Sequence, residues 1–302
     1  MASIDFKNRV VVITGAGAGL GKTYALEFAK RGAKVVVNDL GGSRDGSGES
    51  HNAADTVVDE IKALGAEAVA NYDNVATVEG GENIIQTAID AFGQVDILIN
   101  NAGILRDRSF PKISESEWDS VVGVHLKGAY CVTRPAFIKM KEQGFGRIVF
   151  TTSGAGLYGN FGQANYAAAK TGLIGFMNVL KIEGAKNNIL SNTIAPVAAS
   201  RLTEDVLPPE MFEKLKPEFI VPLVLFLSSE DCQDSGMIFN CAAGWYSRTA
   251  VVCASGTIIG DGSREISPEE IKENWGKITD ISDAKPLGNL GESFGFMAPL
   301  LK

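Results

Sequence analysis

The chain has 302 residues, of which 45% are hydrophobic and 21% charged, a composition typical of globular proteins. Its formal net charge of −8 argues against nucleic acid as a partner, and an anionic substrate would need a local basic patch. No apolar run approaches the ~18 residues of a membrane span. The four cysteines and two histidines lack the spacing of metal ligands. We therefore expect neither a membrane segment nor a metal site.

Apolar strands and amphipathic helices alternate between residues 9 and 194. The expected strands cover residues 9–14, 34–39, 68–72, 95–99, 147–151 and 189–194. The expected helices cover residues 22–31, 53–64, 82–92, 115–141 and 166–186. This alternation predicts an α/β fold of the Rossmann type, a doubly wound parallel sheet with helices on both faces.

Two segments break the alternation. Residues 41–50 are rich in glycine and serine, which indicates a mobile surface loop. The tail from Ala250 has more turns and polar residues, with a capped helix expected at residues 267–270. We therefore expect a domain of residues 1–249 and a C-terminal extension of residues 250–302 that packs on this domain or on a dimer partner.

A glycine-rich turn, TGAGAGLG, follows the first expected strand. Its glycines Gly15, Gly19 and Gly21, with Leu20 between the last two, stand just before a helix. Side chains must be absent where backbone N–H groups approach a pyrophosphate, and the helix N-terminus then faces the negative charge. Such a loop alone could equally be a simple turn, but its place between strand and helix favours dinucleotide binding.

Two further strand ends carry candidate cofactor contacts. Asp39 ends the second strand, where a carboxylate can accept hydrogen bonds from both ribose hydroxyls and repels a 2′-phosphate. This position favours NAD over NADP, although Asp39 could instead cap a loop. Asn101, Ala102 and Gly103 follow the fourth strand, where small residues permit close approach of a cofactor. The same sequence is also a good turn.

The strongest chemical constellation is Ser153 with Tyr166 and Lys170. Tyr166 and Lys170 are four residues apart at the start of a helix and therefore share one face. A nearby ammonium lowers the tyrosine pKa from its usual value of about 10, which makes the phenol a general base. Ser153 ends the preceding strand and could bind the same substrate oxygen. A tyrosine–lysine pair alone is usually helix surface, but Ser153 and the glycine loop favour catalysis.

In order and spacing, these motifs resemble those of the short-chain dehydrogenase/reductase superfamily. The resemblance runs from about residue 6 to residue 245. More narrowly, VVNDLGG, NNAGILRDRSF, LYGNFGQANYAAAK and NTIAP resemble the (3R)-hydroxyacyl-CoA dehydrogenase units of peroxisomal multifunctional enzymes of type 2, also called 17β-hydroxysteroid dehydrogenases type 4. This likeness continues through AAGWYSR and ISPEEIKENW, beyond the usual end of the family.

The resemblance implies a role for each catalytic residue. Tyr166 accepts the proton of the 3-hydroxyl group, Ser153 orients the oxygen, and Lys170 holds the nicotinamide ribose and keeps the Tyr166 pKa low. The hydride passes to NAD. Tyr166 and Lys170 therefore also bind the cofactor, and the resemblance adds further cofactor contacts at Asn74, Val75, Pro196, Ala198 and Ser200.

The sequence departs from the superfamily pattern at two places. His125 stands where many members have the asparagine of a proton relay, and it could carry the relay or fill the core. The usual PG after the sixth strand is Pro196 followed by valine. In addition, Arg106 and Arg108 follow the NNAG turn and could meet CoA phosphates or remain solvated beside Asp107.

The resemblance implies NAD-dependent oxidation of (3R)-3-hydroxyacyl-CoA to 3-ketoacyl-CoA in peroxisomal fatty-acid β-oxidation. It also implies an acyl-CoA substrate, a homodimer, hydratase units fused to or channelling with the chain, and a peroxisomal location, although no targeting signal is visible in the sequence. The alternatives are a 3-ketoacyl carrier-protein or 17β-hydroxysteroid type of reductase or dehydrogenase, and a non-catalytic NAD-binding scaffold.

Overall fold

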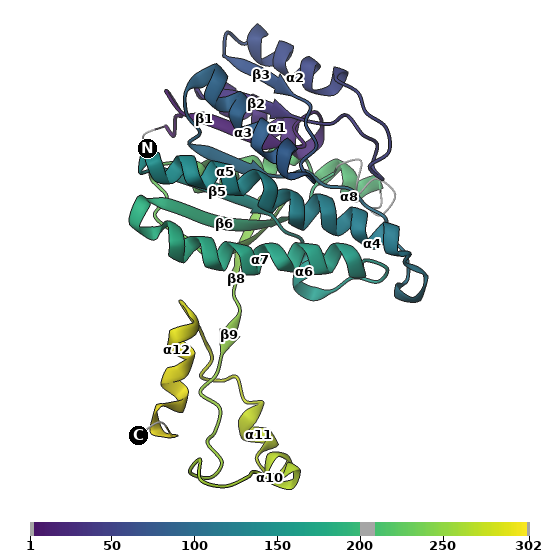
Figure 1. Cartoon of the computed structure of the whole chain (residues 1–302). Helices are drawn as coiled ribbons and strands as arrows, with labels where there is room; N and C mark the ends of the chain where they lie inside the picture. Colours follow the sequence, from purple (N-terminus) through teal and green to yellow (C-terminus); the bar gives the residue numbers. More distant parts are fainter. Residues whose placement is uncertain (1–2, 200–208, 301–302) are drawn as a thin grey trace. The chain divides into compact units, whose positions relative to one another are not determined.

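The computed structural model describes residues 3–199 and 209–300, which divide into the units Met1–Arg248 and Thr249–Lys302 (Figure 1). The first unit contains an eight-stranded sheet in the order β3-β2-β1-β4-β5-β6-β7-β8. Strands β1 to β7 pair in parallel. The predicted Rossmann-type α/β fold is thereby confirmed. Within the described ranges, no helix is long and apolar enough to cross a membrane.

The strands form where β-branched and apolar runs stand in the sequence. Their bounds are β1 Val10–Thr14, β2 Lys34–Asn38, β3 Ala68–Asn71, β4 Ile97–Asn100, β5 Gly146–Thr151, β6 Ile189–Pro196, β7 Ile238–Ala242 and β8 Trp245–Thr249. Every residue of β1, β4 and β5 is buried, as expected for central parallel strands that are covered on both faces. Strands β7 and β8 follow the regular alternation and are not among the strands predicted from the sequence.

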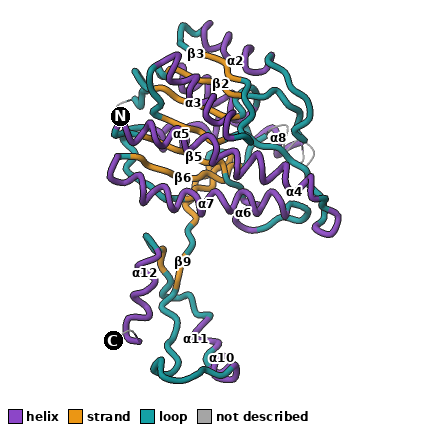
Figure 2. The backbone as a smooth tube through the Cα atoms, viewed as in Figure 1, coloured by secondary structure: helices purple, strands orange, loops and turns teal. Residues whose placement is uncertain are grey.

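Helices cover both faces of the sheet (Figure 2). Their bounds are α1 Gly19–Lys30, α2 Asn52–Ala63, α3 Val78–Phe92, α4 Glu115–Val122, α5 Gly128–Gln143, α6 Gly154–Tyr158, α7 Ala164–Gly184, α8 Pro209–Lys214 and α9 Val221–Ser228. One core cluster joins α1, α2 and α9 to the sheet, with Phe28 and Val224 among its members. The other joins α3, α5 and α7 to the opposite face, with Ile84 and Leu173 among its members.

The helix expected over residues 115–141 is interrupted. Helix α4 ends at Val122, and a five-residue π-helical turn, Gly123–Lys127, leads into α5. Gly128 follows this turn, and a Cβ atom there would lie 3.0 Å from Cγ2 of Val75. Since π turns add one residue to a helical turn and often occur at functional sites, the interruption changes which side chains face the sheet edge. His125 lies in this turn.

The second unit is small and carries little internal packing. It contains a two-stranded antiparallel sheet of β9 Val252–Cys253 and β10 Lys285–Pro286, with helices α10 Pro268–Glu273, α11 Trp275–Ile278 and α12 Leu290–Phe294. Ser267 and Glu270 form the expected capping box of α10. None of the described residues of this unit is buried. The surface on which it packs stays a prediction.

Candidate active site

A cavity of about 810 Å³ lies along the carboxyl ends of the central strands. Gly15 follows β1, Asp39 follows β2, Asn101 follows β4, Thr151 ends β5 and Pro196 ends β6, and all five line this cavity. The strand order reverses between β1 and β4, and ligands of open α/β sheets bind at such a reversal. The volume lies within the ~300–1,000 Å³ that is usual for small-molecule sites.

Most of the site residues expected from the sequence come together at this cavity. Those that line it are Gly15, Gly19, Leu20, Asp39, Asn74, Val75, Asn101, Ala102, Gly103, Tyr166, Lys170, Pro196 and Ala198. Gly21 and Ser153 are not among the lining residues. Ser200 lies outside the described residues.

The glycine loop has the form that a phosphate group needs. Gly15 has φ +66°, and a Cβ atom there would lie 2.8 Å from Cα of Ala102. A Cβ atom at Gly21 would lie 2.1 Å from the carbonyl oxygen of Gly15, so Gly21 serves packing within the loop. Helix α1 begins at Gly19 with no side-chain cap and no acidic residue in its first turn. Its N-terminal N–H groups therefore suit the diphosphate of a dinucleotide.

The NNAG turn is bonded to the glycine loop. Asn101 donates through Nδ2 to the carbonyl oxygens of Thr14 at 3.1 Å and Gly15 at 3.0 Å. In return, Oγ1 of Thr14 accepts the backbone N–H groups of Asn101 and Ala102, both at 3.1 Å. Four hydrogen bonds thus fix the two loops that follow β1 and β4, which are neighbours in the sheet.

Asp39 connects the glycine loop to the segment that follows β2. Its Oδ2 accepts the backbone N–H of Gly17 and its Oδ1 that of Gly41, both at 2.7 Å. It therefore does cap a loop, as one interpretation held, and it also lines the cavity. Each carboxylate oxygen has a second lone pair, so the bonds to the backbone leave acceptor capacity for ribose hydroxyls.

The three candidate catalytic residues lie where β5 ends and α7 begins, and they are Ser153, Tyr166 and Lys170. Ser153 is the N-cap of the short helix α6, where its Oγ accepts the Ala155 N–H at 3.1 Å. Lys170 is buried, and its Nζ donates to the carbonyl oxygen of Thr151 at 2.5 Å. The same Nζ lies 5.5 Å from the centroid of the Tyr166 ring.

Burial governs the proton affinities of this group. Desolvation lowers the pKa of the Lys170 ammonium to about 7. It raises the pKa of Tyr166, an effect that a hydrogen bond with Ser153 opposes and that the charge of Asp107 reinforces. The expectation of a lowered tyrosine pKa is therefore not met by this chain's own groups, because burial is the largest influence on the phenol.

His125 is packed into the wall of the cavity. Its Nε2 lies 3.1 Å from the nitrogen and 2.8 Å from the oxygen of Ile104, while its Nδ1 has no partner among the described residues. Its ring meets that of Tyr166 edge-on, with centroids 5.1 Å apart. A Cβ atom at Gly103 would lie 2.4 Å from Cε1 of His125, so the imidazole requires glycine there. Burial, and then the charge of Lys170, lower the pKa of His125 well below its usual value, which keeps the ring neutral.

Several lining residues were not identified from the sequence. Thr151 and Asp73 stand at strand ends without a distinctive motif. Arg44 lines the cavity although its loop was expected to be mobile. The two arginines after NNAG also differ: Arg106 lines the cavity, whereas Arg108 bonds through Nε to Glu117 at 2.5 Å and is not a lining residue.

Comparison with known proteins assigns the family. A family model described as short chain dehydrogenase matches residues 9–206. The chain belongs to the short chain dehydrogenase family. Peroxisomal multifunctional enzyme A of Dictyostelium discoideum is 58% identical to this dehydrogenase over 281 residues, which are 93% of this chain and 62% of that protein. The family assignment makes it an oxidoreductase that uses a nicotinamide dinucleotide.

Solved structures agree with this assignment. Full-length peroxisomal multifunctional enzyme type 2 from Drosophila melanogaster has a TM-score of 0.83 and 45% identity, covering 99% of this chain and 50% of that one. A 7α-hydroxysteroid dehydrogenase complexed with NADH and 7-oxo glycochenodeoxycholic acid has a TM-score of 0.71 and 29% identity, covering 80% and 95%. This chain therefore spans about half the length of the Drosophila enzyme and 62% of the Dictyostelium one.

Replacing Lys170 by methionine tests the electrostatic cost of its burial. The pKa of about 7 in the folded protein lies below that of a lysine in the unfolded chain, about 10.4. Between these pH values the unfolded state binds more protons, so wild-type stability should rise with pH relative to Lys170→Met, by up to about 1.4 kcal/mol per pH unit. Urea unfolding at about pH 6 and about pH 9 measures the difference. An equal change of the unfolding free energy with pH in the two proteins would contradict this prediction.

Proposed function

We propose that this dehydrogenase oxidises (3R)-3-hydroxyacyl-CoA to 3-ketoacyl-CoA with NAD⁺. The observation that carries the proposal is the 58% identity to a peroxisomal multifunctional enzyme over 93% of the chain, well beyond the 9–206 match of the family model. A likeness of this extent includes both the catalytic segments and most of the C-terminal extension. The fold alone would not define a substrate.

The catalytic residues have the chemistry that the oxidation of a secondary alcohol needs. A bound nicotinamide dinucleotide supplies the acceptor for the hydride that leaves C3. The Tyr166 phenolate accepts the proton of the 3-hydroxyl group, and Ser153 donates a hydrogen bond to the same oxygen. Lys170 places a buried amine 5.5 Å from the Tyr166 ring, where its protonated form stabilises the phenolate.

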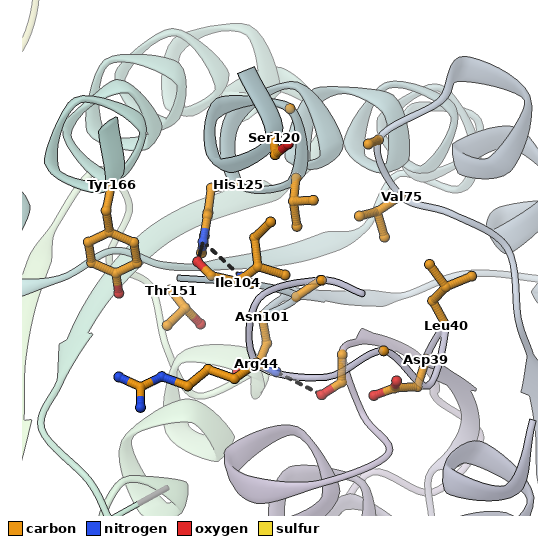
Figure 3. A pocket seen from close by; sticks show the side chains of 18 of the residues that line it. Asp39, Leu40, Arg44, Val75, Asn101, Ile104, Ser120, His125, Thr151 and Tyr166 are labelled. Carbon is orange, nitrogen blue, oxygen red and sulfur yellow. Dashed lines mark hydrogen bonds between the residues drawn. The ribbon is translucent and has the colours of Figure 1, made fainter. Parts of the chain in front are cut away.

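The preference for NAD over NADP rests on Asp39. Its carboxylate lines the cavity at the end of β2 and is held in place by the N–H groups of Gly17 and Gly41. A fixed negative charge there accepts hydrogen bonds from ribose hydroxyls and repels a 2′-phosphate. Arg44 does not reverse this preference, because its side chain extends away from Asp39 in Figure 3.

The proposed location and assembly have separate support. The names of the relatives support a peroxisomal location. Fusion to or channelling with hydratase units is supported by the name of a relative that is 57% identical, the peroxisomal hydratase-dehydrogenase-epimerase of Saccharomyces cerevisiae. A homodimer through α5 and α7 agrees with the exposed apolar side chains on these helices, namely Tyr130, Ile138, Val179 and Ile182. These exposed side chains are additional to the buried residues with which both helices pack on the sheet.

Turnover of the two hydroxyacyl enantiomers tests the proposed reaction. We expect NADH from a (3R)-3-hydroxyacyl-CoA and none above background from the (3S) form, because the hydrogen bond between Ser153 and Tyr166 holds both hydroxyl groups on one side of the substrate oxygen. Absorbance of NADH at saturating NAD⁺ measures both rates. Turnover of the (3S) form alone, or of neither form by a protein that binds NAD⁺, would contradict the substrate assignment.

Replacing Asp39 by asparagine tests the cofactor preference. The amide keeps one of the two acceptor oxygens that bind the backbone N–H groups of Gly17 and Gly41, and it loses the charge that repels a 2′-phosphate. The ratio of kcat/KM for NAD⁺ to that for NADP⁺ should fall by about tenfold or more, the equivalent of ~1.4 kcal/mol. The ratio is measured with one (3R)-hydroxyacyl-CoA in both proteins. An unchanged ratio would show that Asp39 does not set the preference.

A further inference from the structure

Asn165 is a buried polar residue in the first turn of α7, directly before Tyr166. Its exposed fraction is 0%, and it is not among the residues that line the cavity. Because burying an amide without hydrogen-bond partners is costly, a buried asparagine is expected to have specific partners. Any role of Asn165 must therefore come from what it binds within the protein.

The Asn165 side chain uses both ends of its amide. Its Oδ1 accepts the backbone N–H of Tyr166 at 2.8 Å. Its Nδ2 donates to the carbonyl oxygen of Arg106 at 3.2 Å and to that of Glu117 at 3.3 Å. Since the amide nitrogen donates and the amide oxygen accepts, these partners allow one orientation of the group. The side chain thus joins the start of α7 to the segment after the NNAG turn and to α4.

The bond to Tyr166 takes the place of a helix cap. The first N–H groups of a helix have no partner within it, and the N-cap side chain usually accepts one of them. Gln163 is the N-cap of α7, but its side chain makes no capping bond. Its Nε2 donates instead to Oδ2 of Asp107 at 2.7 Å, in an exposed position. Asn165 therefore supplies the missing acceptor, and it does so at Tyr166 itself.

The segment after the NNAG turn is itself held on its other side. The Leu105 N–H donates to the carbonyl oxygen of Arg44 at 3.0 Å. Nε of Arg106 donates to the carbonyl oxygen of Asp45 at 2.9 Å. Both acceptors belong to the loop of residues 41–50, so this loop has defined contacts although its composition indicates mobility. The amide nitrogen of α7 thus binds a fixed backbone position.

The place of the Tyr166 hydroxyl group governs its proton affinity. Burial raises the pKa of Tyr166, the hydrogen bond with Ser153 lowers it, and the charge of Asp107 raises it. A shift of the first turn of α7 would weaken the bond with Ser153 and leave the phenol buried, so the pKa would rise further. The titratable and charged side chains that face the phenol come from α7, the π turn, the segment after the NNAG turn and the loop of residues 41–50, and they are Lys170, His125, Asp107 and Arg44.

We propose that Asn165 is a positioning residue for the proton transfer, which holds Tyr166 against the segment after the NNAG turn so that its hydroxyl stays bonded to Ser153. This inference rests on the proposed role of Tyr166 as the base. Local sequence does not reveal the role, because the two carbonyl partners lie 59 and 48 residues away from Asn165 in the chain.

Replacing Asn165 by alanine or serine tests the proposal by separating turnover from cofactor binding. Asn165→Ala should lower kcat for a (3R)-3-hydroxyacyl-CoA by about 10- to 100-fold, the order of loss that a misplacement of about 1 Å causes. Serine keeps one hydroxyl that can donate to one of the two carbonyl oxygens, so Asn165→Ser should lie between alanine and wild type. NAD⁺ affinity, measured by calorimetry, should stay within about twofold of wild type in both variants.

The pH dependence distinguishes positioning from general destabilisation. A base acts in its deprotonated form, so a raised pKa of Tyr166 moves the acid limb of the kcat profile to higher pH, by about half a unit or more in Asn165→Ala. Ultraviolet titration of the tyrosinate, as the difference from Tyr166→Phe, measures the same pKa without substrate. A role in stability alone would leave both measurements unchanged.

Asn192→Ala is the matched control. Asn192 is also a buried asparagine, whose Nδ2 donates to the carbonyl oxygen of Asp234 at 2.8 Å and whose Oδ1 accepts the Met237 N–H at 3.0 Å. It does not line the cavity. Its replacement should reduce stability in urea but retain the wild-type kcat and pH profile. Should an alanine variant not fold, Asn165→Ser and Asn192→Ser provide the same comparison.

Three results would overturn the proposal. They are a wild-type kcat and pH profile in the Asn165 variants, equal losses of kcat in the Asn165 and Asn192 variants, and a loss of NAD⁺ affinity that accounts for the lost turnover. If wild type oxidised no hydroxyacyl-CoA, the proposed function would be wrong. The tyrosinate titration would then still decide the inference, because an unchanged pKa of Tyr166 in Asn165→Ala would overturn it.

Discussion

The hydrogen bonds between Asn101 and the β1 loop are the interaction on which the site depends. The Asn101 amide donates to the carbonyl oxygens of Thr14 and Gly15, and the Thr14 hydroxyl oxygen accepts the backbone N–H groups of Asn101 and Ala102. Both loops leave adjacent parallel strands, so each alone would be free to move away from the sheet edge. Joined by these hydrogen bonds, the two loops line the cavity and set the position of Gly103. Gly103 has no side chain, which leaves room for the His125 ring.

A second constraint is electrostatic. Lys170 is buried, and its Nζ donates to a backbone carbonyl oxygen. Loss of water lowers the pKa of Lys170 and raises that of Tyr166 beside it. Burial thus disfavours the charged forms of two neighbouring side chains. Shifted pKa values of this kind cluster at catalytic sites. His125, kept neutral by burial, adds no positive charge to this pair.

The sequence predicted the sheet and most of the cavity, because β-branched runs followed by glycine or asparagine mark buried strands and their carboxyl ends. It did not predict the π turn at residues 123–127, since an added residue in a helical turn leaves the apolar pattern nearly unchanged. The sequence pattern did not predict β7 and β8, because β8 follows β7 without the intervening helix that separates the earlier strands. It took residues 41–50 for a mobile loop, because the bonds that order Asp45 and Arg44 include contacts to a segment some sixty residues away.

Tyr166 is the proposed base of the hydride-transfer site, and its replacement by phenylalanine is the decisive experiment for this role. Phenylalanine keeps the ring that packs against His125 and removes only the hydroxyl. NAD⁺ binding is measured by calorimetry, and turnover is measured as NADH production from a (3R)-3-hydroxyacyl-CoA. We expect NAD⁺ binding within about twofold of wild type and a loss of turnover of at least about a hundredfold. Turnover within about tenfold of wild type would show that another group removes the proton.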